Sequence, residues 1–318
     1  MKNLVYILLL SLSFTACEVI VDLDIPKHEP VLVLNSVVKA DSVFNVRLSR
    51  SVGSFDVDRN KEVNDAIISV FQDDVFLGEM STAFVGMSHN YYYNEAGEYV
   101  QGDSVFEYIL NEMPLPGANY TFMVSHYLYE DVQANTELEQ KVTIDFIEIA
   151  KVDNEYSENY KLNFTFFDLP GEHYYRLRII NKVNQFDYEY IDPAFFETSD
   201  PSILSSSVVE SSDPDDVGAF LHDALFTDEF FEGDEKTISL EFFDWSYSDF
   251  DTSSKFYLEL SSISKDYFNY LHSYQRQSNY YGGELFAGEP VQVFTNVQNG
   301  LGILGASNTN SIKLNLPD

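Results

Sequence analysis

The sequence is poorest in cysteine, in basic residues and in long internal apolar runs. Its 318 residues contain one cysteine, Cys17, so no disulfide can form within the chain. Lysine and arginine number 18 against 52 aspartates and glutamates, which gives a formal net charge of −34. Such a charge repels nucleic acid and anionic headgroups, so we expect neither as a partner. No internal segment reaches the roughly 18 apolar residues that a transmembrane helix needs.

Aromatic residues are plentiful instead. The 22 tyrosines and 26 phenylalanines are spread among the acids, whereas disordered acidic chains contain few aromatic residues. The composition therefore predicts a folded protein with an acidic surface. A chain of this length favours two domains over one.

The N-terminal residues have the layout of an export signal. Lys2 supplies a positive charge, residues 4–14 are largely apolar, and small residues precede Cys17. The apolar stretch is too short to span a bilayer as a helix, which is typical of a cleaved secretory signal. The ending resembles a bacterial lipoprotein signal, so we predict removal of residues 1–16 and acylation of Cys17. Two or three acyl chains, worth about 0.8 kcal/mol for each buried CH₂, would give lasting membrane attachment.

Residues 17–30 are predicted to be the acylated cysteine and a tether, because residues 18–30 alternate acidic and apolar residues and contain two prolines. From residue 31 the apolar pattern has a period of two, and short runs rich in β-branched and aromatic residues are separated by turn residues. These runs are residues 31–34, 43–48, 66–71, 75–77, 105–110 and 120–124. They predict an antiparallel, immunoglobulin-like β-sandwich over residues 31–135, although the Cys…Trp…Cys pattern of true immunoglobulin domains is absent.

A polar stretch near residues 135–140 marks the predicted domain boundary, and residues 141–318 form a second β-rich domain. Its predicted strands are residues 142–146, 162–166, 174–180, 237–242 and 256–260. An insertion at 187–235 has the length of a functional loop or an irregular excursion. One α-helix is predicted over 264–280, with Ser264 as its N-cap and a stripe of tyrosines packed against the sheet. The fold class is therefore mainly β.

Catalytic motifs are not found. The histidines are scattered without a His-Glu-x-x-His pattern, and no Gly-x-Ser-x-Gly elbow occurs. A cysteine nucleophile is excluded because the single cysteine is assigned to the lipid. With 52 acids, a pair of catalytic carboxylates could be drawn almost anywhere and carries no information. We therefore predict that the protein is not an enzyme.

One run has part of a calcium-binding pattern. Its oxygen-bearing residues stand at alternate positions, like the start of an EF-hand loop: Asp56, Asp58, Asn60 and Glu62. Lys61 replaces the glycine of such a loop, and Ile67 stands where its bidentate glutamate belongs. A solvated acidic loop is the simpler interpretation, calcium is the alternative, and no other cofactor is predicted.

Two clusters combine tyrosines with polar residues. They comprise Tyr91, Tyr92 and Tyr93, and further along the chain Tyr188 and Tyr190. This composition suits sugar stacking or a protein interface, because tyrosine combines apolar area with a hydroxyl group. Strands with one buried face of rings are the simpler interpretation of both clusters.

Both ends of the chain carry a family resemblance. Residues 260–271 (LSSISKDYFNYL) and 289–306 (EPVQVFTNVQNGLGILGA) closely resemble the C-terminal signature of a family of Bacteroidota surface lipoproteins, domain of unknown function 4249. Residues 29–34 (EPVLVL) and 46–51 (VRLSRS) resemble the way its members begin. The resemblance implies a lipid-anchored location at the surface of the outer membrane. The glycines of residues 299–305 suit a bent strand or a close backbone approach.

Members of this family are often encoded beside TonB-dependent outer-membrane transporters. The resemblance therefore implies a non-enzymatic accessory, lid or substrate-binding subunit of such a β-barrel. Independently of the resemblance, the tyrosine clusters make a glycan or a peptide the expected class of substrate. A free-standing surface binding protein or adhesin that recognises glycan or protein is an alternative. A structural subunit of an envelope assembly machine is another. The resemblance supplies no catalytic residues.

Overall fold

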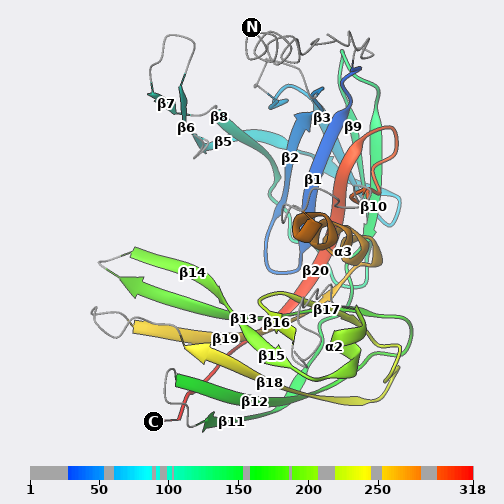
Figure 1. Cartoon of the computed structure of the whole chain (residues 1–318). Coiled ribbons are helices and arrows are strands. Elements are labelled where there is room, and N and C mark those ends of the chain that lie inside the picture. The colour runs from blue at the N-terminus through cyan, green and yellow to red at the C-terminus, as the bar shows by residue number, and fades with distance from the viewer. Residues whose placement is uncertain are drawn as a thin grey trace, which may run out of the picture.

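The computed structural model describes residues 28–53, 61–87, 91–93, 99–101, 104–152, 158–185, 188–206, 219–244, 253–280 and 292–317. Within these ranges the chain is mainly β, with several antiparallel sheets and two helices, which confirms the predicted fold class (Figure 1). Neither helix has the length and apolar character that a bilayer crossing requires.

Most of the elements in the described ranges are strands. In the first half they are β1 (Leu32–Lys39), β2 (Phe44–Arg50), β3 (Ile67–Gln72), β4 (Val75–Glu79), β5 (Ser81–Met87), β6 (Tyr91–Tyr93), β7 (Tyr99–Gln101), β8 (Ser104–Leu110), β9 (Asn119–Ser125) and β10 (Val132–Glu137). In the second half they are β11 (Ile144–Val152), β12 (Glu158–Phe167), β13 (Tyr174–Gln185), β14 (Tyr188–Ala194), β15 (Phe196–Thr198), α2 (Pro201–Ser206), β16 (Ala219–Leu221), β17 (Ala224–Thr227), β18 (Glu235–Asp244), β19 (Ser253–Ile263), α3 (Lys265–Tyr280) and β20 (Leu301–Lys313).

A single nine-stranded sheet runs through the molecule. Its order is β14-β13-β19-β20-β1-β2-β8-β5, and β17 pairs with β13 beside this path. A four-stranded sheet, β10-β9-β3-β4, packs on the first part of it, and a five-stranded sheet, β11-β12-β18-β15-β16, packs on the second part. Besides a two-stranded sheet, β6-β7, the described residues form two sandwiches that share one sheet, which we call the first lobe and the second lobe (Figure 1).

The strand β20 joins the two lobes. Its first half, Leu301 to Ser307, pairs in parallel with β1, and its second half, Ser307 to Lys313, pairs antiparallel with β19. Ser307 is the residue at which the partner changes. The sequence pattern placed this segment in the second domain, but it also completes the sheet of the first lobe. The first sandwich therefore includes a parallel pair alongside the antiparallel pairs that were predicted.

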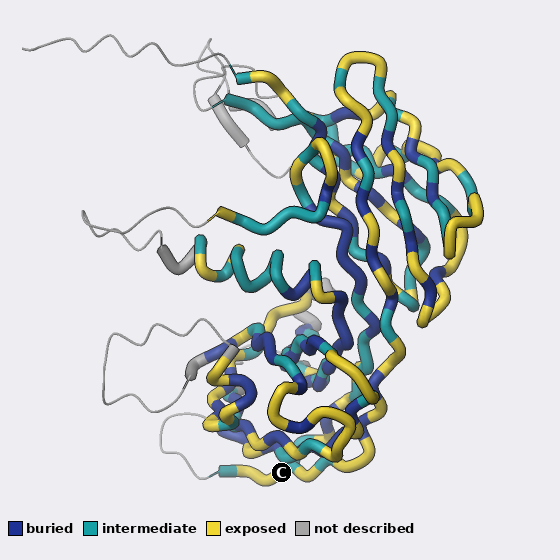
Figure 2. The backbone as a smooth tube through the Cα atoms, turned by 90° about the vertical axis from the view of Figure 1, so that its right-hand side faces the viewer, coloured by how far each residue is buried: buried dark blue, intermediate teal, exposed yellow. Residues whose placement is uncertain are grey.

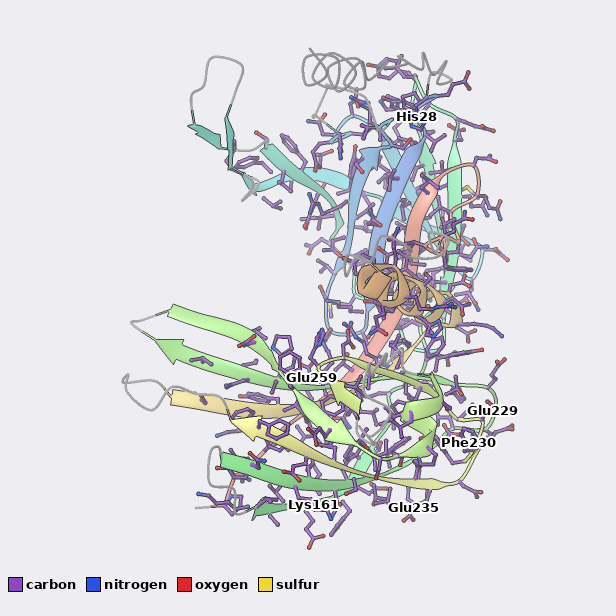
Figure 3. All side chains as sticks on the ribbon, viewed as in Figure 1. His28, Lys161, Glu229, Phe230, Glu235 and Glu259 are labelled. Atoms are coloured by element: carbon purple, nitrogen blue, oxygen red, sulfur yellow. The ribbon has the colours of Figure 1, made fainter. Side chains whose placement is uncertain are left out.

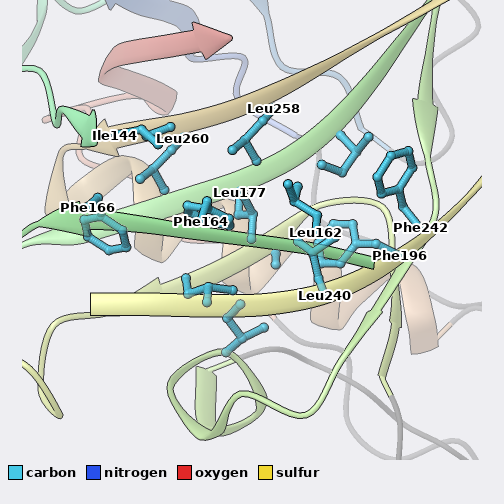
Figure 4. Close-up of a cluster of buried hydrophobic side chains, with 14 of the residues drawn as sticks. Ile144, Leu162, Phe164, Phe166, Leu177, Phe196, Leu240, Phe242, Leu258 and Leu260 are labelled. Carbon is cyan, nitrogen blue, oxygen red and sulfur yellow. The ribbon is translucent and has the colours of Figure 1, made fainter. Parts of the chain in front are cut away.

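Each lobe has its own core. Side chains alternate between the two faces of a strand, so each strand turns one face to the core and the other away from it. Figure 2 follows this alternation of buried and exposed residues along the chain. Leu304 and Ala306 of β20 lie in the first core, and Leu314 just beyond β20 lies in the second. Figure 4 shows part of the second core, with Phe164, Leu240 and their neighbours between the two sheets. Since these β20 residues alternate along the strand, both cores lie on the same face of the shared sheet.

The connection between the lobes crosses the core face of β20. Asn308 Nδ2 donates to the Glu139 carbonyl at 2.9 Å, and Asn310 Nδ2 donates to the Val142 carbonyl at 3.0 Å. These amides satisfy backbone oxygens at the point where one core ends and the next begins. The predicted boundary around residues 135–141 falls at the end of β10 and in this connection.

The insertion predicted at 187–235 carries regular structure in its described parts. It supplies β14 to β17 and α2, and Phe196, Ile203 and Phe226 are buried in the second core. The apolar runs of this region are short and stand among many serines and acids, so the sequence pattern did not predict these strands. Residues 207–218 lie outside the described ranges.

The helix predicted over 264–280 is confirmed as α3. Ser264 is its N-cap, since its Oγ accepts the Tyr267 N–H at 3.4 Å and the Ala306 N–H at 3.1 Å. Tyr267 and Phe268 are buried against the sheet with Ile303 of β20, on the face opposite the two cores. Tyr274 is exposed, so only the first part of the tyrosine stripe packs as expected.

Candidate functional site

A cavity of about 830 Å³ opens on the face of the shared sheet that is turned away from the two cores. Residues of β1, β2, β13, β19 and β20 form its floor, Glu107 of β8 lies at one side, and Tyr267 and Tyr270 of α3 lie at the other. We call this cavity the sheet groove. In Figure 3, Glu259 marks its position between the two lobes.

The strand registers align polar residues in rows across the floor. Arg176 of β13 pairs with Ser261 of β19, which pairs with Thr309 of β20. The neighbouring row is Arg178, Glu259 and Ser311. Residues two apart on a strand point to the same face, so both rows project into the groove. Ser261 Oγ and Thr309 Oγ1 are hydrogen-bonded at 2.8 Å.

Arg176 is held in a fixed orientation. Its Nε donates to Asp223 Oδ1 at 2.6 Å, its Nη2 donates to Asp223 Oδ2, and its Nη1 reaches the Tyr267 hydroxyl at 3.4 Å. Burial by itself lowers the pKa of Arg176, but the hydrogen bonds and charge of Asp223 outweigh it and raise that pKa. Bidentate Arg–carboxylate pairs of this kind add geometric precision as well as energy. The guanidinium is therefore a rigid part of the groove wall.

Arg178 is paired across strands. Its Nη2 donates to Glu259 Oε2 at 2.7 Å, and the two residues stand directly opposite each other in the β13–β19 register. Opposite charges at such positions stabilise a sheet. The buried Nε of Arg178 has no hydrogen-bond partner within the described structure.

The groove collects a large share of the few basic residues. Three of the six arginines of the chain line it, Arg47, Arg176 and Arg178, together with Lys39. Each of these arginines has a carboxylate partner, since Arg47 Nη2 lies 3.0 Å from Glu62 Oε1. The groove is therefore close to neutral and rich in hydrogen-bonding groups, in contrast to the strongly acidic chain. Such a surface can bind and orient a polar molecule.

The tyrosines of α3 add hydroxyl groups at the edge of the groove. Burial, followed by the neighbouring Tyr274 and Tyr267, raises the pKa of Tyr270. Its hydroxyl therefore keeps its proton at neutral and mildly alkaline pH and can act as a hydrogen-bond donor.

The predicted calcium site falls largely outside the described residues. Asp56, Asp58 and Asn60 lie outside the described residues, as does the lipidation residue Cys17. Glu62 is described, and its carboxylate pairs with Arg47. Within the described ranges no group of three or more His, Cys, Asp or Glu side chains is arranged for a metal ion.

The two predicted tyrosine clusters lie on strands, and only the backbone of these tyrosines is described. Tyr91, Tyr92 and Tyr93 form β6, and Tyr188 and Tyr190 lie on β14. In Figure 1, β6 belongs to an arm that extends from β5 and β8, and β14 belongs to an arm formed with β13. Both arms extend toward the same side in that view, one from each lobe. The strands β8 and β13, which line the groove, continue into them.

Sequence reasoning missed the groove, because its rows come from strands far apart in the chain. Arg178 and Glu259 are separated by 81 residues, and Ser261 and Thr309 by 48. One signal was present: Arg176 and Arg178 alternate with apolar residues in a predicted strand, which places both charges on one face.

The comparisons with known proteins agree with the resemblance at the two ends of the chain. The model of the family described as Domain of unknown function (DUF4249) matches residues 19–313. No curated protein and no solved structure shows significant similarity to the chain. Because the family model covers nearly the whole sequence, the protein belongs to the family described as Domain of unknown function (DUF4249).

Proposed function

We propose that the protein is a non-enzymatic lipoprotein of the outer-membrane surface that binds a polar ligand in the sheet groove, as an accessory or lid subunit of a TonB-dependent transporter-type barrel. The sheet groove is the observation that carries the binding role. Its arginines are held by carboxylates, and its floor belongs to a continuous sheet, so little side-chain freedom is lost when a ligand binds.

The position of the first described residue supports the anchored arrangement. His28 lies at one end of the molecule, where its Nε2 is 2.8 Å from Ser51 Oγ (Figure 3). A lipid on Cys17 would therefore hold the molecule by the outer end of the first lobe. The groove, between the lobes, would remain accessible to ligand or to a partner.

Exposed apolar side chains on the arm of the first lobe support the proposal of a protein partner. Phe84 of β5 is 59% exposed and lies edge-on to Phe106 of β8 at a centroid distance of 5.7 Å, and Val85 is also exposed. Exposed apolar patches of this kind often mark protein interfaces. The predicted interaction residues of β6 belong to the same arm.

Co-purification tests the partner. The protein is tagged at its C-terminus, extracted from outer membranes in mild detergent, and its companions are identified by mass spectrometry. A stoichiometric transporter barrel supports the accessory role, whereas a protein that elutes alone favours the free-standing surface binder. If deletion of the protein disturbs many outer-membrane proteins, an envelope assembly role replaces both.

Two variants test the anchor and the groove. Replacing Cys17 with alanine should release the protein from the membrane fraction, and retention there would overturn the anchoring.

Ser311→Trp places a large ring in the groove and should abolish ligand capture from a panel of glycans and peptides. Lys313→Trp, an exposed position on the same strand outside the groove lining, is the matched control and should bind as the wild type does.

A further inference from the structure

The turn between β9 and β10 carries two adjacent apolar side chains that are exposed to solvent. Tyr127 is 77% exposed, the highest value among the large hydrophobic residues of the described part, and the adjacent Leu128 is 66% exposed. Neither side chain belongs to a core cluster. Folding therefore leaves the apolar area of these two adjacent side chains exposed to water.

A buried histidine holds the turn in shape. His126, whose side chain is 3% exposed, accepts the Leu128 N–H on Nδ1 at 3.1 Å. The ring proton is therefore on Nε2, which donates to Asp65 Oδ1 at 3.0 Å. The ring also lies against Tyr127 and Tyr129, at centroid distances of 4.5 and 4.9 Å. The exposed pair is thus displayed on a preorganised turn, so binding through it has a small entropic cost.

The turn lies at the same end of the molecule as the start of the described chain. Asn299 Nδ2 donates to the Asp131 carbonyl at 3.4 Å, and a Cβ at Gly300 would lie 2.7 Å from the Leu32 carbonyl and 2.8 Å from Val132 Cγ1. The beginnings of β1, β10 and β20 are therefore neighbours, and the β9–β10 turn projects beyond them, as Figure 1 shows.

The chain outside the described residues limits the distance to the lipid. Residues 18–27 lie between the predicted acylation site, Cys17, and His28, and a chain extends at most about 3.5 Å per residue. The outer end of the first lobe is therefore held within roughly 40 Å of the bilayer. The opposite end of the molecule is not restrained to this distance.

We propose that Tyr127 and Leu128 enter the lipid–water interface of the membrane that holds the acyl chains of Cys17. The inference rests on the proposed lipid anchor. Tyrosine favours the headgroup level, where its ring is half in contact with hydrocarbon and its hydroxyl with water, and leucine inserts its apolar side chain. Glu130 and Asp131 follow the pair and remain in water, so the contact suits a zwitterionic surface better than an anionic one. With this contact the lobe stands on the membrane in a defined orientation.

Depth-dependent quenching tests the contact on the acylated full-length chain. Trp245, the single tryptophan, is first replaced by phenylalanine, and Leu128→Trp is then introduced. In phosphatidylcholine vesicles with brominated acyl chains, the emission of Leu128→Trp should shift to the blue and lose most of its intensity. Leu115→Trp is the matched control, because Leu115 is 57% exposed on the β8–β9 loop at the opposite end of β9. Its emission should not change.

Vesicle sedimentation separates this inference from the anchor. If the wild-type chain sediments with vesicles but Leu128→Trp and Leu115→Trp are quenched equally, or neither is quenched, the membrane contact is overturned. The lipid anchor is then still supported. A wild-type chain that stays in the supernatant overturns both. Quenching of Leu128→Trp alone, lost in the Cys17→Ala background, supports the contact and its dependence on the lipid.

Discussion

The ring of Tyr267 lies directly against the backbone of Gly305, so that a Cβ at position 305 would be 2.6 Å from Tyr267 Cγ. This contact seats α3 on β20, and the hydroxyl of the same tyrosine reaches Arg176 in the groove wall. The glycines of residues 299–305 therefore have the structural role that the sequence predicted. Gly302 shows it as well, with a φ of 100° and an added Cβ only 2.1 Å from the Leu34 carbonyl oxygen.

Gly305→Ala should destabilise the protein by about 1–3 kcal/mol, because the new methyl group overlaps a ring that is packed on a sheet. Urea unfolding measures the change in the free energy of unfolding. In a Tyr267→Ala background the same substitution should cost less, since the ring has gone. An equal cost in both backgrounds would show that the ring contact is not the cause.

Asn308→Ala should weaken the junction between the lobes. The buried amide donates to the Glu139 carbonyl, and losing it leaves that oxygen without a donor, at a cost of about 1–3 kcal/mol. Limited proteolysis should cut the variant faster near residues 138–143 than the wild type. Asn163→Ala, which removes an exposed bond to Glu148, is the control and should leave the cleavage rate unchanged. Equal cleavage of the two variants would contradict the junction role.

Asp223→Ala should cost about 1–3 kcal/mol, because it leaves the largely buried guanidinium of Arg176 without its carboxylate. The double variant Arg176→Met with Asp223→Ala should recover part of this loss, since the unpaired charge is then removed as well. Thermal unfolding of Asp223→Ala, of Arg176→Met and of the double variant gives the double-mutant cycle for this pair. Additive losses would mean that the pair does not act as a unit.

Glu139→Gln should stabilise the protein at neutral pH. Burial, followed by the charge of Glu137, raises the pKa of Glu139, and His173 lowers it only in part. Between the unfolded and folded pKa values the folded chain binds more protons, so the stability from this group falls as pH rises above the ordinary glutamate range. Below that range Glu139 is protonated in both states, and the advantage of glutamine should vanish.

Urea midpoints of wild type and Glu139→Gln from pH 3.5 to 8 measure this difference. Glu112→Gln, at an exposed position of the first lobe, is the control for a simple change in net charge. If the Glu112 variant reproduces the pH profile of Glu139→Gln, burial at the junction is not responsible.

Much of the secondary structure could be predicted, because its signals are local. The predicted runs 105–110 and 120–124 lie within β8 and β9, and the run 43–48 begins one residue before β2. Alternation also marked the buried faces of β2 and β9. Ser264, as the predicted N-cap, marked the start of α3. The strand β10 was missed, because its sequence VQANTE is polar and its buried face has only Val132, Ala134 and Thr136.

The sequence by itself determined the class of the fold, the faces of most strands and the helix beside the last strand, since these depend on periodicity and capping within a few residues. It also predicts the lipid on Cys17. Only the tertiary structure decided that β20 changes partner at Ser307 and that Arg176, Ser261 and Thr309 form one row. Strand neighbours depend on the global topology, and no local pattern specifies which distant strand supplies the next residue across a sheet.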